Sequence, residues 1–327
     1  MVALEDRVAA LEALIGGGVS AVLVDCVTDT IADALDLAAA GTPITITVQG
    51  LCEEDVFIDK DDVTLKGATG PATDEIVGGI TIDGAQRVTV QDLTIRDGTT
   101  TPDPSFPVGV FLTDLASATL QNLDVFGHGG AGIWARRNAF VLLDTVDVSI
   151  PAGGEEAVLL ADGADARIQD STIVSNNPAA FFGAALGLFR SAHARLDGGN
   201  TIQNTTADPD PAKAIAITVA DTSNLRIQRS GNTVEGNVQV ETNSQGDFRG
   251  VTFVGQTLIS GQSSVTYSQD PSITGNILLQ QQAMLQAFGA AGDVDVSGTV
   301  TCTDTQSGIV DFALSAGGGV IGCTVLP

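Results

Sequence analysis

The chain has 327 residues, of which 43% are hydrophobic and 17% charged, so it can form a continuous apolar core and is not a disordered chain. Forty acidic against 14 basic residues give a net charge of −26. This balance argues against nucleic acid and anionic membrane surfaces as partners, because binding phosphate needs clustered Lys and Arg. No run of about 18 apolar residues occurs, so no membrane insertion is predicted.

Residues 1–18 are predicted to form a short coiled-coil oligomerisation segment. Its apolar residues are spaced four, three and four positions apart, as in a heptad: Leu4, Val8, Leu11 and Ile15. Two heptads are too short to be stable as a lone helix, so the segment needs partner strands. The stretch RVAALE resembles the signature of short trimeric coiled coils, which implies contact between Arg7 of one chain and Glu12 of the next in a homotrimer. A fortuitous amphipathic helix or an engineered tag is the alternative.

Residues 19–60 are predicted to form an N-terminal cap. Ala21–Val24 and ITITVQG (44–50) have the composition of strands. Between them, Thr28-Asp29-Thr30 supplies capping side chains for a helix that ends at Gly41. Because a solenoid exposes an apolar cross-section at its end, we expect this helix to cover it.

The four cysteines form two local pairs, one near each end of the chain: Cys26 with Cys52, and Cys302 with Cys323. This is one of three pairings, and we favour it because a rod keeps its two ends apart. Two disulfides imply an oxidising compartment, so we expect the protein to be secreted or on the cell surface. No metal site is predicted, because no C-x-x-C pair or nearby histidine is present. Four buried free thiols are the alternative.

A spacing repeat from residue 61 to residue 327 determines the predicted fold. In ITIDGAQRVTVQDLTI (80–95), Val90 follows Ile82 after eight residues and Ile95 follows after five more. The interval of eight recurs along the chain at steps of 19 to 31 residues, with Gly, Asn and Asp at the bends. Strand-rich coils of this length are typical of a parallel β-helix. The chain resembles the right-handed parallel β-helix of pectate lyases, polygalacturonases and viral tailspikes, which implies an all-β solenoid.

One position of the repeat, three residues before the closing apolar residue of each coil, carries mostly Asp, Asn and Gly. Its members are Asp92, Asn122, Thr145, Asp170, Gly199, Gly231 and Gly250. These residue types are the ones that a turn with left-handed backbone selects, so the column predicts such a turn in each coil.

The long insertions all precede the same strand of the repeat and therefore project from one edge of the rod. They are residues 97–107, 126–132, 149–156, 174–184 and 203–213. Insertions of this kind commonly mark the binding face of a solenoid. The adjacent strand alternates inward and outward, which predicts an outward apolar row with a neighbouring cation. The residues concerned are Phe111, Trp134, Leu159, Phe189 and Arg136.

An exposed apolar row of this kind is expected to be buried by a ligand or by another protomer, and the sequence allows both. A polysaccharide could stack on the aromatic rings beside the charged residues. Alternatively, the rows of three protomers could bury one another, and the coiled-coil pattern favours this interface slightly.

Catalytic candidates are few. Gly127-His128-Gly129 resembles the Gly-His-Gly element of polygalacturonases, but that family's Asn-Thr-Asp, Asp-Asp and Arg-Ile-Lys motifs do not accompany it. His128 is more simply explained as a turn residue. Charged side chains that could reach the groove are Asp83, Asp97, Asp103, Arg136, Arg137, Glu155 and Glu156. A lyase would need a Ca²⁺ cage with an Arg or Lys base, and a hydrolase two carboxylates. Solvated surface acids are the simpler account.

The sequence therefore predicts an extracytoplasmic, trimeric β-helix protein that binds polysaccharide or serves as a surface or fibre module. The alternative is a polysaccharide lyase or glycoside hydrolase that uses the same loop-lined face. No cofactor is predicted except Ca²⁺ under the lyase alternative.

Overall fold

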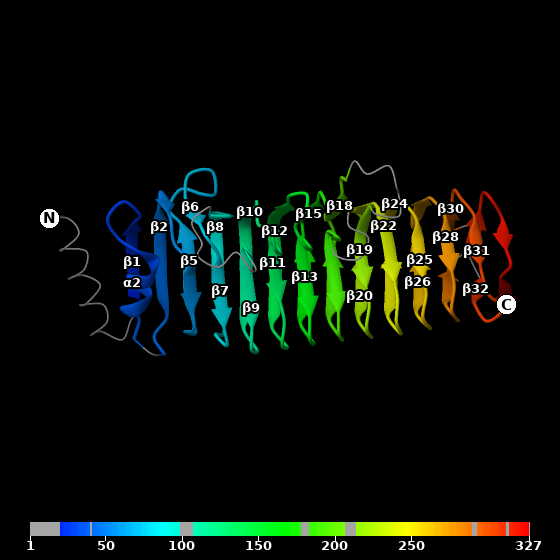
Figure 1. Ribbon diagram of the computed structural model, residues 1–327, viewed down its shortest axis with the longest axis horizontal. Coiled ribbons are helices and arrows are strands. Elements are labelled where there is room, and N and C mark those ends of the chain that lie inside the picture. The colour runs from blue at the N-terminus through cyan, green and yellow to red at the C-terminus, as the bar shows by residue number, and fades with distance from the viewer. Residues whose placement is uncertain are drawn as a thin grey trace.

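The computed structural model describes residues 20–39, 41–98, 107–177, 183–206, 214–289, 293–311 and 314–326. The chain is an elongated right-handed parallel β-helix whose coils stack side by side from β1 to β35 (Figure 1). This confirms the predicted fold class. Asp103 and the whole coiled-coil prediction, including Leu4, Arg7, Val8, Leu11, Glu12 and Ile15, lie outside the described residues. Among the described residues no helix is long and apolar enough to span a membrane.

Two parallel sheets surround the core. The smaller one, called sheet B here, takes one short strand from each of twelve coils. Its strands are β4 (Val56–Ile58), β7 (Ile80–Asp83), β9 (Val110–Thr113), β11 (Ile133–Ala135), β13 (Val158–Ala161), β16 (Leu186–Phe189), β19 (Ile215–Val219), β22 (Asn237–Val240), β25 (Thr257–Ile259), β28 (Ile277–Leu279), β31 (Val300–Cys302) and β34 (Val320–Ile321).

The larger sheet, called sheet A here, contains the other 23 strands and bends around the rest of each coil. They are β1 (Ser20–Asp25), β2 (Ile44–Gln49), β3 (Leu51–Cys52), β5 (Val63–Gly67), β6 (Glu75–Val77), β8 (Val88–Arg96), β10 (Ser117–Phe126), β12 (Phe140–Ile150), β14 (Asp165–Gln169), β15 (Thr172–Ser175), β17 (His193–Asp197), β18 (Thr201–Asn204), β20 (Asn224–Gln228), β21 (Asn232–Glu235), β23 (Gln245–Arg249), β24 (Val251–Val254), β26 (Ser264–Ser268), β27 (Ser272–Thr274), β29 (Met284–Phe288), β30 (Val294–Val296), β32 (Gly308–Asp311), β33 (Leu314–Ala316) and β35 (Thr324–Leu326).

The predicted spacing places the core correctly. Ile82, Val90 and Ile95 are fully buried, and their equivalents in the following coils stack above them. The bend of sheet A falls at the predicted turn column: Asp92, Asn122, Thr145, Asp170, Gly199, Gly231 and Gly250 all have positive φ, between 48° and 95°. The left-handed backbone is therefore what the Asp, Asn and Gly residues of this column accommodate.

The turns that follow the sheet B strands form a second edge of the rod, called the turn edge here. In the first half of the rod it carries ion pairs between successive coils: Arg87 with Asp62 at 2.6 Å, Arg137 with Asp114 at 3.1 Å, and Arg190 with Asp162 at 2.8 Å. In the second half the corresponding turns carry amides, at Asn243, Gln262, Gln281, Gln282 and Gln306. Along the rod, ion pairs between successive coils thus give way to amide side chains.

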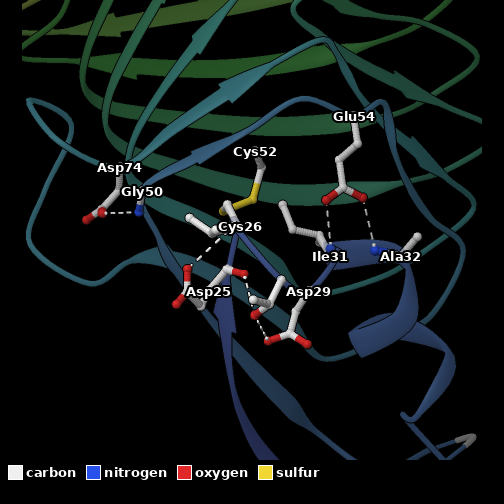
Figure 2. The surroundings of a disulfide bond; sticks show 11 residues. Asp25, Cys26, Asp29, Ile31, Ala32, Gly50, Cys52, Glu54 and Asp74 are labelled. Atoms are coloured by element: carbon white, nitrogen blue, oxygen red, sulfur yellow. Dashed lines mark hydrogen bonds between the residues drawn. A yellow bond between two sulfur atoms is a disulfide. The ribbon is translucent and has the colours of Figure 1, made fainter. Parts of the chain in front are cut away.

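Helix α2 (Ile31–Asp36) covers the first coil, next to the Cys26–Cys52 disulfide (Figure 2). Thr30 is its N-cap, and the Glu54 carboxylate accepts the backbone N–H groups of Ile31 and Ala32 at 2.8 and 3.2 Å. The helix is shorter than predicted. At its C-terminal end the ammonium of Lys60 donates to the Leu35 carbonyl at 2.6 Å and so satisfies a terminal acceptor.

Both predicted disulfides are confirmed, with Cα–Cα distances of 4.8 Å for Cys26–Cys52 and 4.9 Å for Cys302–Cys323. Strand β2 of the predicted cap pairs in register with β1 on one side and with β5 on the other. Both cap strands therefore continue sheet A, and the division of the chain near residue 60 stays a prediction.

Candidate functional site

An outward row of large apolar side chains runs along sheet B beside the loop-bearing edge. Trp134 lies in register between Phe111 on one side and Leu159 on the other. The inward neighbours Ile133 and Ala135 are fully buried, as the strand alternation requires. Phe111 and Trp134 are partly exposed and their ring centroids are 5.2 Å apart, whereas Leu159 is only 9% exposed. The partly exposed apolar members of the predicted row are thus Phe111, Trp134 and Phe189, and the rings of the first two are in contact.

Arg136 lies over this pair. Its guanidinium carbon is 4.8 Å from the ring centroid of Phe111 and 5.0 Å from that of Trp134, and its buried Nε has no hydrogen-bond partner among the described residues. Most other arginines of the described chain are ion-paired: Arg87, Arg96, Arg137, Arg167, Arg190, Arg195, Arg226 and Arg249. Arg136 has no carboxylate within ion-pair distance in the described ranges. Among the residues that the structure describes, the two aromatic rings are what holds this cation.

The other two charged candidates on these strands do not join Arg136. Arg137 turns away onto the turn edge, where its Nη1 contacts Asp114. Asp83 ends β7 opposite Thr113, in the same outward column as Arg136 but two coils before it. Adjacent residues 136 and 137 therefore have different roles, because the strand ends at Ala135 and the backbone enters the left-handed turn at Arg137.

Glu156 is the acid that the structure brings to this face. It is fully buried. A Cβ on Gly187 would lie 2.8 Å from the Cγ of Glu156 and also against the Phe189 ring, so the glycine makes room for the glutamate side chain. Gly187 is in register with Leu159, so the carboxyl group lies among apolar side chains. Neither carboxyl oxygen has a hydrogen-bond partner in the described part of the chain.

This environment raises the pKa of Glu156 from its ordinary value near 4.5 to about 7. Burial is the main cause, because an ionised carboxylate loses its hydration, and the charge of the half-buried Glu155 adds to it. The backbone N–H groups of Glu156 and Gly183 lie near enough to oppose the shift in part, although neither meets the geometry of a hydrogen bond to the carboxyl oxygens. Near neutral pH a substantial share of the molecules therefore carries a neutral carboxylic acid here.

His128 belongs to the wall of the rod and not to its surface. It is 1% exposed, and its ring lies beside Gly109 and the core residue Val125, where a Cβ on Gly109 would be 2.8 Å from Cδ2. Burial lowers its pKa, which Asp97, Asp55 and the Ile95 carbonyl oppose in part. Its Nε2 has no hydrogen-bond partner within the described ranges. A ligand could reach it only after a rearrangement of the loop.

We call the resulting surface the aromatic face. It consists of Phe111, Trp134, Arg136, Glu156, Leu159 and Phe189. The described residues contain no group of three His, Cys, Asp or Glu side chains that could hold a metal ion. The Ca²⁺ cage of the lyase alternative stays a prediction.

No protein-family model and no curated protein matches the chain. Similar solved structures include ORF18 of Geobacillus virus E2, at 14% identity and a TM-score of 0.49, with 94% of this chain and 63% of that chain covered. A GH87 alpha-1,3-glucanase catalytic domain matches at 13% identity and a TM-score of 0.45, covering 95% and 68%. The pectin methylesterase PemA from Erwinia chrysanthemi matches at 15% and 0.37, covering 76% and 80%. The functional assignment of this chain therefore rests on its own residues.

Proposed function

We propose that this chain is an extracytoplasmic β-helix protein that binds polysaccharide on the aromatic face. The observation that carries the proposal is Arg136, a guanidinium that lies over Phe111 and Trp134 and has no carboxylate partner within the described ranges of the chain. Aromatic rings offer apolar surface to the C–H groups of sugars, and the planar guanidinium offers several N–H donors to hydroxyl and acid groups. Both kinds of contact occur here within one pair of coils.

Arg136 favours a polysaccharide that carries acidic groups. The chain has a net charge of −26, yet this cation has no carboxylate of its own in the described residues. An acidic sugar would supply the missing partner through charge-assisted hydrogen bonds. Below pH 7 the neighbouring Glu156 is mostly protonated and so does not repel such a ligand.

The location and assembly of the protein are part of this proposal. The two disulfides support an oxidising, extracytoplasmic compartment. A homotrimer formed through residues 1–18 would present three aromatic faces, and a long polymer could then bind several of them with increased avidity.

The experiment uses the fact that Trp134 is the only tryptophan of the chain, so its fluorescence reports on the aromatic face. Polygalacturonate and a neutral glucan are titrated into the full chain at pH 6 and low salt. We expect the emission to change with saturation, at lower concentration for the acidic polymer, and the response to weaken with added salt. If no polysaccharide changes the emission but dissociation of the oligomer does, the aromatic face would instead be a protomer interface.

Glu156 favours a second candidate, cleavage of the bound polysaccharide, for which the side chains that bury this carboxyl group would have to move aside. A carboxylic acid kept neutral near pH 7 in an apolar site is what a general acid requires. Release of reducing ends, or of ultraviolet-absorbing unsaturated product, that disappears in Glu156→Gln would establish it. Binding without product leaves only the recognition function.

A further inference from the structure

A polar groove lies on the turn edge of the C-terminal coils, where β22, β25, β28 and β31 end. It is open to solvent and has a volume of about 600 Å³. We call it the amide groove, because successive turns line it with carboxamides: Asn243, Gln262, Gln280, Gln281, Gln282 and Gln306. It belongs to other coils than the aromatic face and follows the sheet B strands, whereas the long loops precede them.

The amides of the groove form a ladder along the rod. Nε2 of Gln262 donates to Oε1 of Gln282 at 2.8 Å, and Nε2 of Gln282 donates to Oε1 of Gln306 in the next coil. A carboxamide has two N–H donors and an oxygen with two lone pairs. The ladder uses one donor of each of the first two amides, so further donors and acceptors face the solvent at regular intervals.

The charge of the lining excludes several ligand classes. No lysine or arginine lines the groove, so an anion would find no counter-charge. The carboxylate in the lining, Asp304, accepts the backbone N–H groups of Gln281, Gln306 and Ser307 at 2.6, 2.8 and 2.7 Å and the Ser307 hydroxyl at 2.9 Å. Its lone pairs are used within the turn, which leaves little capacity for a cation. The lining also contains no aromatic or aliphatic residue that would hold an apolar ligand.

The backbone of these turns is left-handed at the groove residues. Gln262, Gln281 and Gln282 have φ of 63°, 57° and 67°, in the left-handed region that disfavours residues with a Cβ. Glycine satisfies the same conformation without strain, as Gly84 does earlier on this edge. Non-glycine residues with positive φ also occur on this edge outside the groove, at Asp114, Arg137 and Arg190, so the conformation belongs to the repeated turn and makes glycine a conservative replacement there.

We infer that the amide groove is a second binding site, for the hydroxyl groups of an extended neutral polysaccharide. A sugar hydroxyl both donates and accepts, which matches amides that offer both kinds of group. Coils stack about 4.8 Å apart, so the ladder presents its groups along a line parallel to the rod axis, as an extended chain requires. This site is independent of the aromatic face and of the function proposed for it.

The test measures the affinity of the full chain for two neutral probes, dextran and a soluble β-glucan, by calorimetry or affinity electrophoresis. The double variant Gln262→Gly with Gln282→Gly removes two ladder amides and places glycine where the backbone is already left-handed. We expect at least tenfold weaker binding and an unchanged or higher melting temperature. Gln269→Gly is the matched control, since Gln269 is also exposed with φ of 63° but lies outside the groove. It should bind like the unmodified chain.

Three outcomes would overturn the inference. The first is that neither neutral probe binds at millimolar sugar concentration. The second is equal loss of binding in Gln269→Gly and the double variant. The third is loss of neutral-probe binding in Trp134→Ala, which would place the sugar on the aromatic face. Retention of binding in Trp134→Ala, together with its loss in the double variant, supports the amide groove whether or not the aromatic face binds acidic polymers.

Discussion

The guanidinium carbon of Arg136 lies 4.8 Å from the ring centroid of Phe111, a residue of the preceding coil. The contact arises because Trp134 is in register with Phe111, so a side chain two positions after Trp134 can fold back over both rings. A cation in this position is partly desolvated, and no carboxylate of the described residues neutralises it, so any hydrogen bond that it makes to an acidic ligand is strengthened.

Arg136→Gln is expected to weaken binding of an acidic polysaccharide by roughly tenfold or more, because a charge-assisted hydrogen bond is worth about 1.5 kcal/mol or more. Arg137→Gln is the control, since that guanidinium pairs with Asp114 on the turn edge, and its effect should stay within about twofold. Tryptophan fluorescence titration measures both. Equal losses in the two variants would show that only net charge matters.

Glu156 should make stability depend on pH. Its pKa in the folded state, about 7, lies above the ordinary value near 4.5, so between these values the folded chain holds a proton that the unfolded chain releases. Stability contributed by this group is therefore present below pH 4.5 and lost as the pH rises through 7. The full loss amounts to about 3 kcal/mol.

The variant Glu156→Gln removes this ionisation and should be more stable than the parent at pH 8 by a similar amount, with little difference at pH 4. Melting temperatures of both proteins across this range measure the effect. The comparison also separates Glu156 from His128, whose lowered pKa destabilises the fold at acid pH in parent and variant alike. A constant difference from pH 4 to pH 8 would refute the shift.

Thr145 is the β-branched member of the left-handed turn column, with φ of 58°. Thr145→Asn should raise the free energy of unfolding by about 1 kcal/mol, because Asn tolerates this conformation and Thr does not. Gly199→Thr, at the equivalent position of another coil, should be destabilising, because a Cβ there would lie 2.1 Å from Asp170 Oδ1. Chemical denaturation of both variants tests the column, and no gain at position 145 would count against strain there.

Glu54 caps helix α2 with two hydrogen bonds, so Glu54→Ala should lower the free energy of unfolding by about 1–2 kcal/mol. Glu53→Ala is the matched control, because Glu53 is an exposed neighbour with the same charge. Hydrogen exchange at Ile31 and Ala32 should speed up in the first variant only. Similar exchange in both would assign the effect to net charge.

The spacing of apolar residues was sufficient to predict the inward residues, the left-handed turn column and the outward position of Phe111 and Trp134. These follow from a repeat of two along a strand and a stacking register that each coil imposes on the next. The disulfide pairing followed from the same linear order. Such features are local, or are copied from coil to coil.

The details of the candidate site could not be predicted in this way. A period of two says that residue 187 faces outward, but not that a glycine there lets Glu156 fold over it and become buried. It also does not separate Arg136 from Arg137, whose directions depend on where the strand ends. The glycine in an outward strand position was the available signal, since such glycines often mark a close approach by another group.

The two disulfides join neighbouring coils near each end of the described rod. An array of stacked repeats opens from its outermost units, because these have a neighbour on one side only. The disulfides therefore stabilise the coils in which unfolding would begin. With the disulfides intact we expect the outer coils to resist local unfolding and stepwise proteolysis. After reduction we expect the rod to unfold coil by coil from its outer coils.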